Sequence, residues 1–167
     1  RRVSFDDGRR GGLLGQGSLL TVTSYANRTS PVLRGRWLLE NILGTPVPAP
    51  PPDIPELSED GAEGEEVSLR EQLEKHSRNP ACVSCHQLMD PLGFALENFD
   101  AIGGWRTLDE RGAPIRAVAE LPDGTSFEGP LDLRNLLLRR RTEFVTTVTT
   151  EDYFYVPGSE LAQSIHG

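Results

Sequence analysis

Residues 79–94, NPACVSCHQLMDPLGF, decide how the rest of this sequence is interpreted. They contain the string CVSCH at residues 82–86, and its cysteines are the only two in a chain of 167 residues. Cysteines at this spacing lie on one helical turn, so both thiols can form thioethers with the vinyl groups of one porphyrin. The adjacent His86 can then offer an imidazole nitrogen to the iron. The string is therefore typical of a covalent c-type haem site, with Cys82 and Cys85 as attachment points.

Short signals on either side of the string predict the helix that carries it. Asn79 is a favourable N-cap, and Pro80 is a favourable first helical residue. Asp90-Pro91 is expected to end the helix, because the residue before a proline is disfavoured in the helical region. We therefore expect a short helix over residues 80–88.

Other chemistries compete for the same two cysteines. Zinc is the first, but the chain has only two Cys and three His, and the adjacent Cys85 and His86 cannot easily bind one tetrahedral ion. A redox-active dithiol is the second alternative. A structural disulfide is disfavoured, because the short spacer between the cysteines closes a strained ring.

Longer stretches of the chain resemble a known family. Residues 79–106 read NPACVSCHQLMDPLGFALENFDAIGGWR, residues 18–44 read SLLTVTSYANRTSPVLRGRWLLENILG, and residues 121–138 read LPDGTSFEGPLDLRNLLL. Together they resemble the C-terminal haem region of the planctomycete-type cytochrome c family, whose members are large, secreted, multidomain bacterial proteins of uncharacterised function. The resemblance covers roughly residues 10–150, whereas residues 149–167 depart from the pattern.

The resemblance implies one covalently bound haem c per chain. It also implies that the sequence is a piece of a longer precursor, whose other domains or subunits would be partners. A histidine at the place of His76 belongs to the pattern as well.

The charge of the chain limits its partners. A net charge of −8 argues against nucleic acid and anionic lipid as ligands. An acidic surface suits a basic redox partner, although it also serves simple solubility.

The sequence also bears on where the protein acts. No apolar run is long enough to span a bilayer, and Arg1-Arg2 lead into polar residues rather than into a signal peptide. Because haem is attached to such strings outside the bacterial inner membrane, we expect an upstream leader and a periplasmic or extracellular location.

The remaining pattern predicts a mainly α fold with a small β-hairpin and much loop, similar to a c-type cytochrome haem domain. With 17 Gly, 13 Pro and 7% aromatic residues, the apolar core is expected to be modest, and the porphyrin would supply part of it. Three parts are expected: an N-terminal segment (1–45) with one helix packing on the haem domain, a Pro-rich and then acidic linker (46–66), and a monohaem domain (67–167).

Local signals predict the individual elements. Residues 18–25 are β-prone and predict a short strand. The other expected elements are a helix from Ser30-Pro31 to about Leu43 stopped by Gly44, a helix from Ser68 to about Ser77 with Glu71 completing a capping box, a hairpin of residues 114–120 and 125–128, and a last helix from Leu131 to about Thr147.

The second axial position on the iron decides the chemistry, and three side chains compete for it. His76 lies ten residues before His86, and a chain reversal at Asn79-Pro80 can bring it to the distal face. Met89 would raise the potential as a ligand, but its place on the same short helix puts it on the same side of the ring as His86. His166 lies close to the end of the sequence. An open or water-occupied position, or a ligand from another domain, is also possible.

Aromatic and basic residues around the string are expected to line the haem pocket. Apolar rings exclude water from the porphyrin, and Arg106 can pair with a propionate. The expected aromatic residues are Tyr25, Phe94, Phe99 and Trp105.

These observations favour a monohaem electron-transfer module within a larger extracytoplasmic protein or complex. Since the sequence shows no separate catalytic constellation, whether the chain is an enzyme stays open. A peroxidase-like oxidising domain with His76 as distal base is one alternative. A structural haem subunit of an assembly is another.

Overall fold

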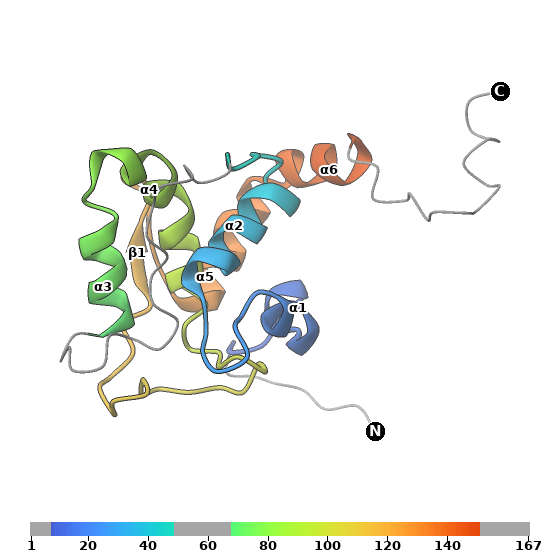
Figure 1. Ribbon diagram of the computed structural model, residues 1–167. Helices are drawn as coiled ribbons and strands as arrows, with labels where there is room; N and C mark the ends of the chain where they lie inside the picture. Colours follow the sequence, from blue (N-terminus) through green and yellow to red (C-terminus); the bar gives the residue numbers. More distant parts are fainter. Residues whose placement is uncertain (1–7, 49–67, 151–167) are drawn as a thin grey trace, which may run out of the picture.

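The computed structural model describes residues 8–48 and 68–150, which form helices and one small sheet (Figure 1). The elements in chain order are the 3-10 turn η1 (Leu13–Gly15), α1 (Gly17–Val22), α2 (Pro31–Asn41), α3 (Leu69–His76), α4 (Pro80–Phe94), β1 (Val118–Glu120), β2 (Ser126–Glu128), α5 (Gly129–Arg139) and α6 (Arg141–Thr150). The predicted mainly α architecture with a hairpin is confirmed. Its likeness to a cytochrome and its division into three parts stay predictions, and most of the expected linker lies outside the described residues. None of the helices in the described ranges is long and apolar enough to cross a membrane.

The centre of the fold is the crossing of α2 and α4 (Figure 1). Gly35 of α2 lies against the backbone of Met89, and Gly93 of α4 lies against the backbone of Pro31. A Cβ atom at either glycine would collide with a carbonyl oxygen of the other helix. Both positions therefore require glycine because the two backbones approach each other closely.

The hydrophobic core includes residues of this crossing and of the elements packed around it. It is built mainly from leucines, because the helices present them at helical spacing on their inner faces. Its members are Leu14, Leu19, Leu20, Leu38, Leu39, Ile42, Met89, Leu92, Ala95, Leu96, Phe99, Ala119, Leu121, Phe127, Leu133 and Leu136.

The predicted hairpin is present with shorter strands than expected. β1 and β2 pair antiparallel, with Ala119 opposite Phe127, and only these middle residues of the two strands are buried. The turn between them closes through Gly124, whose φ of 81° suits glycine. The hairpin thus covers the core with one face, and it also packs against α4.

The predicted starts of α2 and α3 are confirmed, and each has the expected capping hydrogen bond. The Ser30 side chain accepts a hydrogen bond from Leu33 N at 3.2 Å at the start of α2. Ser68 and Glu71 form the capping box of α3, in which Ser68 N donates to the Glu71 carboxylate at 2.9 Å. These bonds depend on residues three apart, so the local sequence is sufficient to predict them.

The predicted strand over residues 18–25 is wrong, because this segment contains α1. Leu19 and Leu20 are both buried in the core, which a helix allows and an alternating strand does not. The hydroxyl of Thr23 donates to Leu19 O at 2.8 Å and ends the helix with a side-chain bond. The extended pairing that remains is a single bridge between Ser24 and Thr29.

The predicted stop at Asp90-Pro91 is also wrong, because α4 continues to Phe94. Pro91 has no N–H for the carbonyl of the preceding turn, and a proline inside a helix costs about 3 kcal/mol. Leu92 and Phe94 follow it and are buried, and each such side chain contributes about 1.5–3 kcal/mol. The burial of Leu92 and Phe94 thus outweighs the local preference of Asp90-Pro91 to end the helix.

The single last helix expected over residues 131–147 is two helices. α5 begins at Gly129, and it ends at Arg139 because the next residue, Arg140, leaves the helical region with φ of −93° and ψ of 24°. α6 then starts at Arg141. The three consecutive arginines in this region therefore mark a bend.

A buried arginine joins α2 to the segment that follows α4. Arg34 is fully buried, and it donates to the carbonyl oxygens of Leu96 (2.9 Å), Phe99 (2.8 Å) and Asp100 (2.8 Å). Its guanidinium also lies 3.2 Å from the carboxylate of Glu97. Burial lowers the pKa of Arg34, and the charge of Glu97 acts in the opposite direction. This arginine fixes the chain as it leaves α4.

Candidate haem-attachment site

The cysteine string occupies the first two turns of α4. The helix starts as predicted at Pro80, with the backbone N–H of Cys82 donating to Asn79 O at 2.8 Å. Cys82 is buried, Cys85 is partly buried against the core, and both are free thiols. Residues three apart on a helix are neighbours on its surface, so the two sulfur atoms share one flank of α4.

His86 follows the thiols and is held by a carboxylate one turn further along α4. Its Nδ1 lies 3.0 Å from each carboxylate oxygen of Asp90. The two side chains are only 13% and 6% exposed. Because Nδ1 contacts a carboxylate, the neutral imidazole of His86 carries its proton on Nδ1. The lone pair of Nε2 is then free to bind a metal ion.

His76 lies against His86, although the two come from different helices. Their rings are 5.3 Å apart between centroids and meet edge to face at 70°. The connection from α3 to α4 reverses the chain between them, as expected from Asn79-Pro80. The structure thus brings together two of the three histidines, and His166 lies outside the described residues.

The chemistry of these donors fits a c-type haem. Two free thiols share one flank of a helix turn, and the next imidazole presents Nε2 while Nδ1 is engaged. In the described part of the chain, no three His, Cys, Asp or Glu side chains are grouped as metal ligands. A haem iron needs few protein ligands, because the porphyrin nitrogens supply the rest of its coordination.

Met89 is on the same helix as these donors, but its side chain is taken up by packing. It is 5% exposed and belongs to the hydrophobic core, where its backbone meets Gly35 of α2. The structure therefore gives Met89 a packing role, and its ligation of iron stays a prediction that the geometry does not favour.

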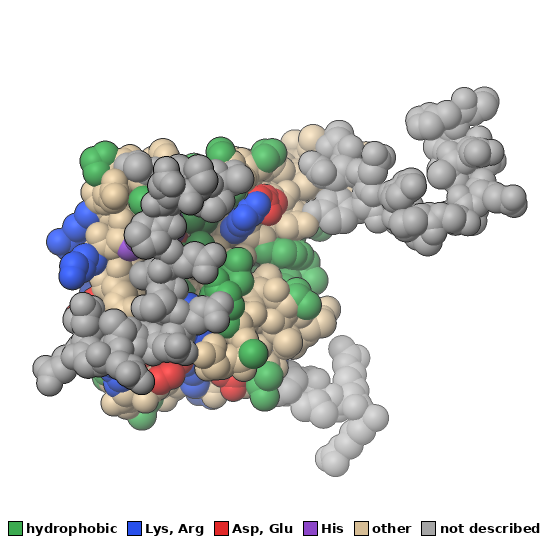
Figure 2. All heavy atoms as spheres, in the orientation of Figure 1, with side chains coloured by type: hydrophobic (Ala, Val, Ile, Leu, Met, Phe, Trp, Pro, Cys, Tyr) green, Lys and Arg blue, Asp and Glu red, His purple; other side chains and the backbone are tan. Residues whose placement is uncertain are grey.

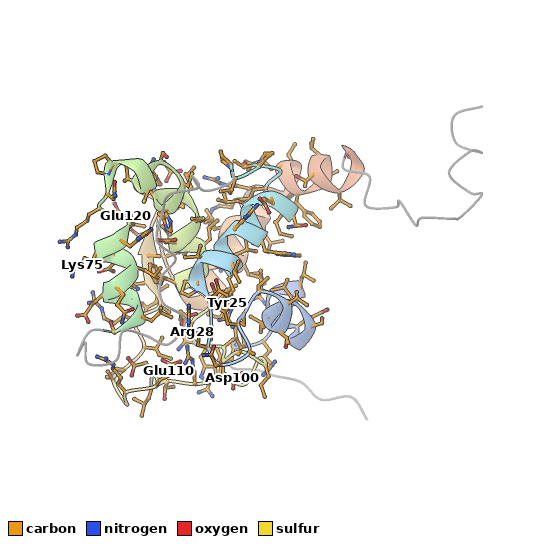
Figure 3. The ribbon with its side chains drawn as sticks, viewed as in Figure 1. Tyr25, Arg28, Lys75, Asp100, Glu110 and Glu120 are labelled. Atoms are coloured by element: carbon orange, nitrogen blue, oxygen red, sulfur yellow. The ribbon has the colours of Figure 1, made fainter. Side chains whose placement is uncertain are left out.

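A hollow of about 400 Å³ opens beside His86. Its walls come from α3, α4 and the hairpin turn, and Glu120 of β1 lies at this side of the molecule in Figure 3. The lining residues are Arg70, Glu74, Ser77, Val83, His86, Gln87, Asp90, Pro91, Phe94, Ala119, Glu120, Leu121 and Pro122. This volume is within the range of small-molecule sites.

Phe94 is the only predicted pocket residue that lines this hollow. It is buried, and the guanidinium of Arg70 lies 4.4 Å from the centroid of its ring. Arg70 is fixed in turn by Glu74, 2.7 Å from its Nε. The basic group beside Phe94 was not expected from the sequence.

The other predicted pocket residues lie elsewhere. Trp105 packs edge to face on Phe99, with centroids 5.3 Å apart, and its buried indole N–H has no hydrogen-bond acceptor. Tyr25 is exposed beneath the guanidinium of Arg28, at 4.4 Å (Figure 3). None of these rings lines the hollow beside His86.

Arg106 is engaged in a network of its own. It donates to the Glu97 carboxylate at 2.9 Å, to Glu110 at 2.5 Å and to Thr29 Oγ1 at 3.1 Å. These bonds leave its guanidinium committed to neighbouring side chains. Its pairing with a propionate therefore stays a prediction, for which the structure shows a competing role.

Positive charge gathers at the α3 edge despite the acidic composition. Figure 2 shows Lys and Arg side chains along this edge, and Lys75 is labelled there in Figure 3. Lys75 and Arg78 are both exposed at the end of α3, next to His76. The surface close to the cysteine string is thus less acidic than the net charge of −8 implies.

Asp90 is the site residue that the sequence analysis missed. Asp90-Pro91 is typical of a helix end, so local signals do not reveal that Asp90 lies one turn after His86 on the same helix. The available signal was the spacing of four between the two residues, which places them on one face of any helix that continues.

Comparison with known families gives one match. A sequence model of the PSCyt3 family, described as "Protein of unknown function (DUF1588)", matches residues 10–109. The matched range includes α1 to α4 and with them the whole cysteine string. Comparison with curated proteins and with solved structures gives no match.

Proposed function

The chain belongs to the PSCyt3 family, and on this premise we propose that it is a monohaem c-type module that transfers electrons. The element "Cyt" in the family's name is consistent with a cytochrome, but the family carries no assigned function. The observation that carries the proposal is the geometry of α4: two free thiols on one flank, followed by an imidazole whose Nδ1 is held by Asp90. When bound, a haem supplies a one-electron couple between ferric and ferrous iron.

The chain's own residues have separate tasks in this proposal. Cys82 and Cys85 would hold the porphyrin through thioether bonds, and His86 would offer Nε2 to the iron. Asp90 keeps the imidazole in one tautomer and orientation. The close contact between α2 and α4 at Gly35 and Gly93 keeps this helix in place.

We propose His76 as the second residue that would hold the haem iron. It is the described histidine that touches His86, and it comes from a different helix. In the present edge-to-face contact the two rings leave no room for a porphyrin between them. Binding in this way therefore requires α3 to move away from α4.

The attachment chemistry also bears on location. Haem is joined to such strings outside the bacterial inner membrane, so we propose a periplasmic or extracellular protein. Electron donors and acceptors would be proteins met there, or other parts of a larger assembly.

The test is production of the chain in a bacterial periplasm with the machinery for haem attachment. We expect a red protein whose intact mass exceeds that of the polypeptide by one haem and whose pyridine haemochrome spectrum has the c-type position. Replacing both Cys82 and Cys85 by alanine should remove the covalent haem. Ser84→Ala is the matched control, because Ser84 lies inside the string and is exposed. A colourless parent chain with the bare polypeptide mass would overturn the proposal.

The absorption spectrum separates electron transfer from the enzymatic alternative. A six-coordinate, low-spin ferric haem favours electron transfer. A high-spin haem that binds cyanide quickly favours an oxidising enzyme, for which the hollow beside His86 offers a substrate site.

A further inference from the structure

We propose that Asp90 is a positioning residue that lowers the reduction potential of the haem iron held by His86. It does so by accepting the Nδ1 proton of His86 in a buried hydrogen bond. The inference rests on the proposed function, since it concerns a haem at residues 82–86. It assigns a role to a residue that appeared in the sequence only as a helix stop.

The contact between the two side chains is close and shielded. Both Asp90 oxygens lie 3.0 Å from Nδ1, within ordinary hydrogen-bond distance. The Asp90 side chain is 6% exposed, so little water competes for its carboxylate. A charge-assisted bond in such surroundings is stronger than one between neutral groups.

The backbone holds the carboxylate in place because α4 continues past Pro91. Residues four apart on a helix lie one above the other, so His86 and Asp90 face each other only while both are helical. Leu92 and Gly93 anchor the next turn in the α2 crossing. The geometry thus depends on tertiary packing and not on the two side chains alone.

The direction of the effect follows from charge. A carboxylate that accepts the Nδ1 proton makes the imidazole a stronger electron donor through Nε2. A more basic ligand and a nearby negative charge stabilise ferric iron over ferrous iron, because the ferric ion has one more positive charge. The Nδ1 proton stays on His86 in both states, so the electron is exchanged with an external one-electron carrier without transfer of a proton.

Other charged groups around the hollow do not replace Asp90. Arg70 and Glu74 pair with each other at 2.7 Å. Glu120 is exposed on β1, where it accepts a hydrogen bond from Ser126 at 3.1 Å. Neither Glu74 nor Glu120 has a hydrogen bond to His86, and both are exposed, so water screens their charges.

The test compares midpoint potentials of haem-loaded variants by spectroelectrochemistry. We expect Asp90→Asn and Asp90→Ser to shift the equilibrium at least tenfold toward ferrous iron, which is a rise of about 59 mV for a one-electron couple. Asp90→Glu keeps a carboxylate and should lie between the parent and Asp90→Asn. Glu120→Gln is the control that removes a carboxylate from the same hollow, and its potential should change much less.

Haem content and the unfolding midpoint are measured for each variant, so that a structural defect is recognised. Potentials of Asp90→Asn and Asp90→Ser equal to that of the parent, at full haem content, would overturn the inference and leave the proposed function intact. Isolation of both variants without haem would also overturn it, because Asp90 would then serve attachment or folding. A parent chain without haem would instead refute the proposed function.

Discussion

Replacement of Arg34 by leucine should destabilise the protein by about 4 kcal/mol, the scale expected when one partner of a buried ion pair is removed. Arg34 is fully buried and bonds to three backbone carbonyls and to Glu97. Leu96 O still accepts from Phe99 N at 2.9 Å and Asp100 O from Gly103 N at 3.2 Å, so Phe99 O is the carbonyl that depends on Arg34. A buried acceptor left without a donor costs about 1–3 kcal/mol. Glu97 keeps Arg106 at 2.9 Å and Thr29 at 2.8 Å, which holds the total below the sum of all four losses.

The assay is urea unfolding followed by circular dichroism, with parent and variant at equal haem content. Arg36→Leu is the matched control, because Arg36 is on the same helix, has a side chain 42% exposed and pairs with Glu40 at the surface. Such exposed pairs contribute about 0.3–0.5 kcal/mol, so the control should unfold close to the parent. A loss below about 1 kcal/mol for Arg34→Leu, with an unchanged slope against urea, would refute the reasoning that these buried bonds hold the fold.

Three further predictions follow from the crossing, the histidine pair and the α3 cap. Gly93→Ala should destabilise the fold by about 1–3 kcal/mol in urea unfolding, because the new methyl group meets the Pro31 carbonyl. Gly15→Ala is the control, since its methyl group would have ordinary contacts and its midpoint should differ little from the parent. Equal midpoints for the two variants would contradict the close approach of α2 and α4. His76→Ala should convert a low-spin ferric haem to a high-spin one in the absorption spectrum, and an unchanged spectrum would exclude His76 as the ligand. Ser68→Ala should cost about 1 kcal/mol in the same unfolding assay, because α3 loses its capping box, and no loss would show that the bond does not contribute.

Features that depend on neighbours in the sequence could be predicted, and those that depend on distant packing could not. The caps at Ser30 and Ser68 and the Gly124 turn involve residues within three or four positions, so their signals are local. The helix over Leu19 and Leu20 forms because both side chains reach the core, which the β-prone composition of residues 18–25 does not reveal. In the same way, Pro91 stays inside α4 because the residues after it are buried, which the local preference of Asp90-Pro91 does not reveal.

The candidate site divides in the same way. The short spacing in the sequence is enough to place Cys82, Cys85 and His86 together. His76 lies beside His86 in the structure, whereas its expected place on the distal face of a haem stays a prediction. Arg106 is expected at the pocket because it can pair with a propionate, but its guanidinium bonds to Glu97, nine residues earlier, and to Thr29, 77 residues earlier, and the contact with Thr29 depends on the fold. Asp90 was missed because its role depends on a helix that local rules end too early.

Because Arg34 of α2 bonds to the segment after α4, the protein cannot be shortened freely from its N-terminal side. A fragment that starts at Ser68 would retain every cysteine and both described histidines, yet the carbonyls of Leu96, Phe99 and Asp100 would lose the guanidinium of Arg34 that joins them. We therefore expect that α4 cannot be transplanted as a minimal haem-binding cassette without the stretch that contains Arg34 and Gly35. Any attempt to graft this cofactor helix onto another scaffold must carry both halves of the crossing.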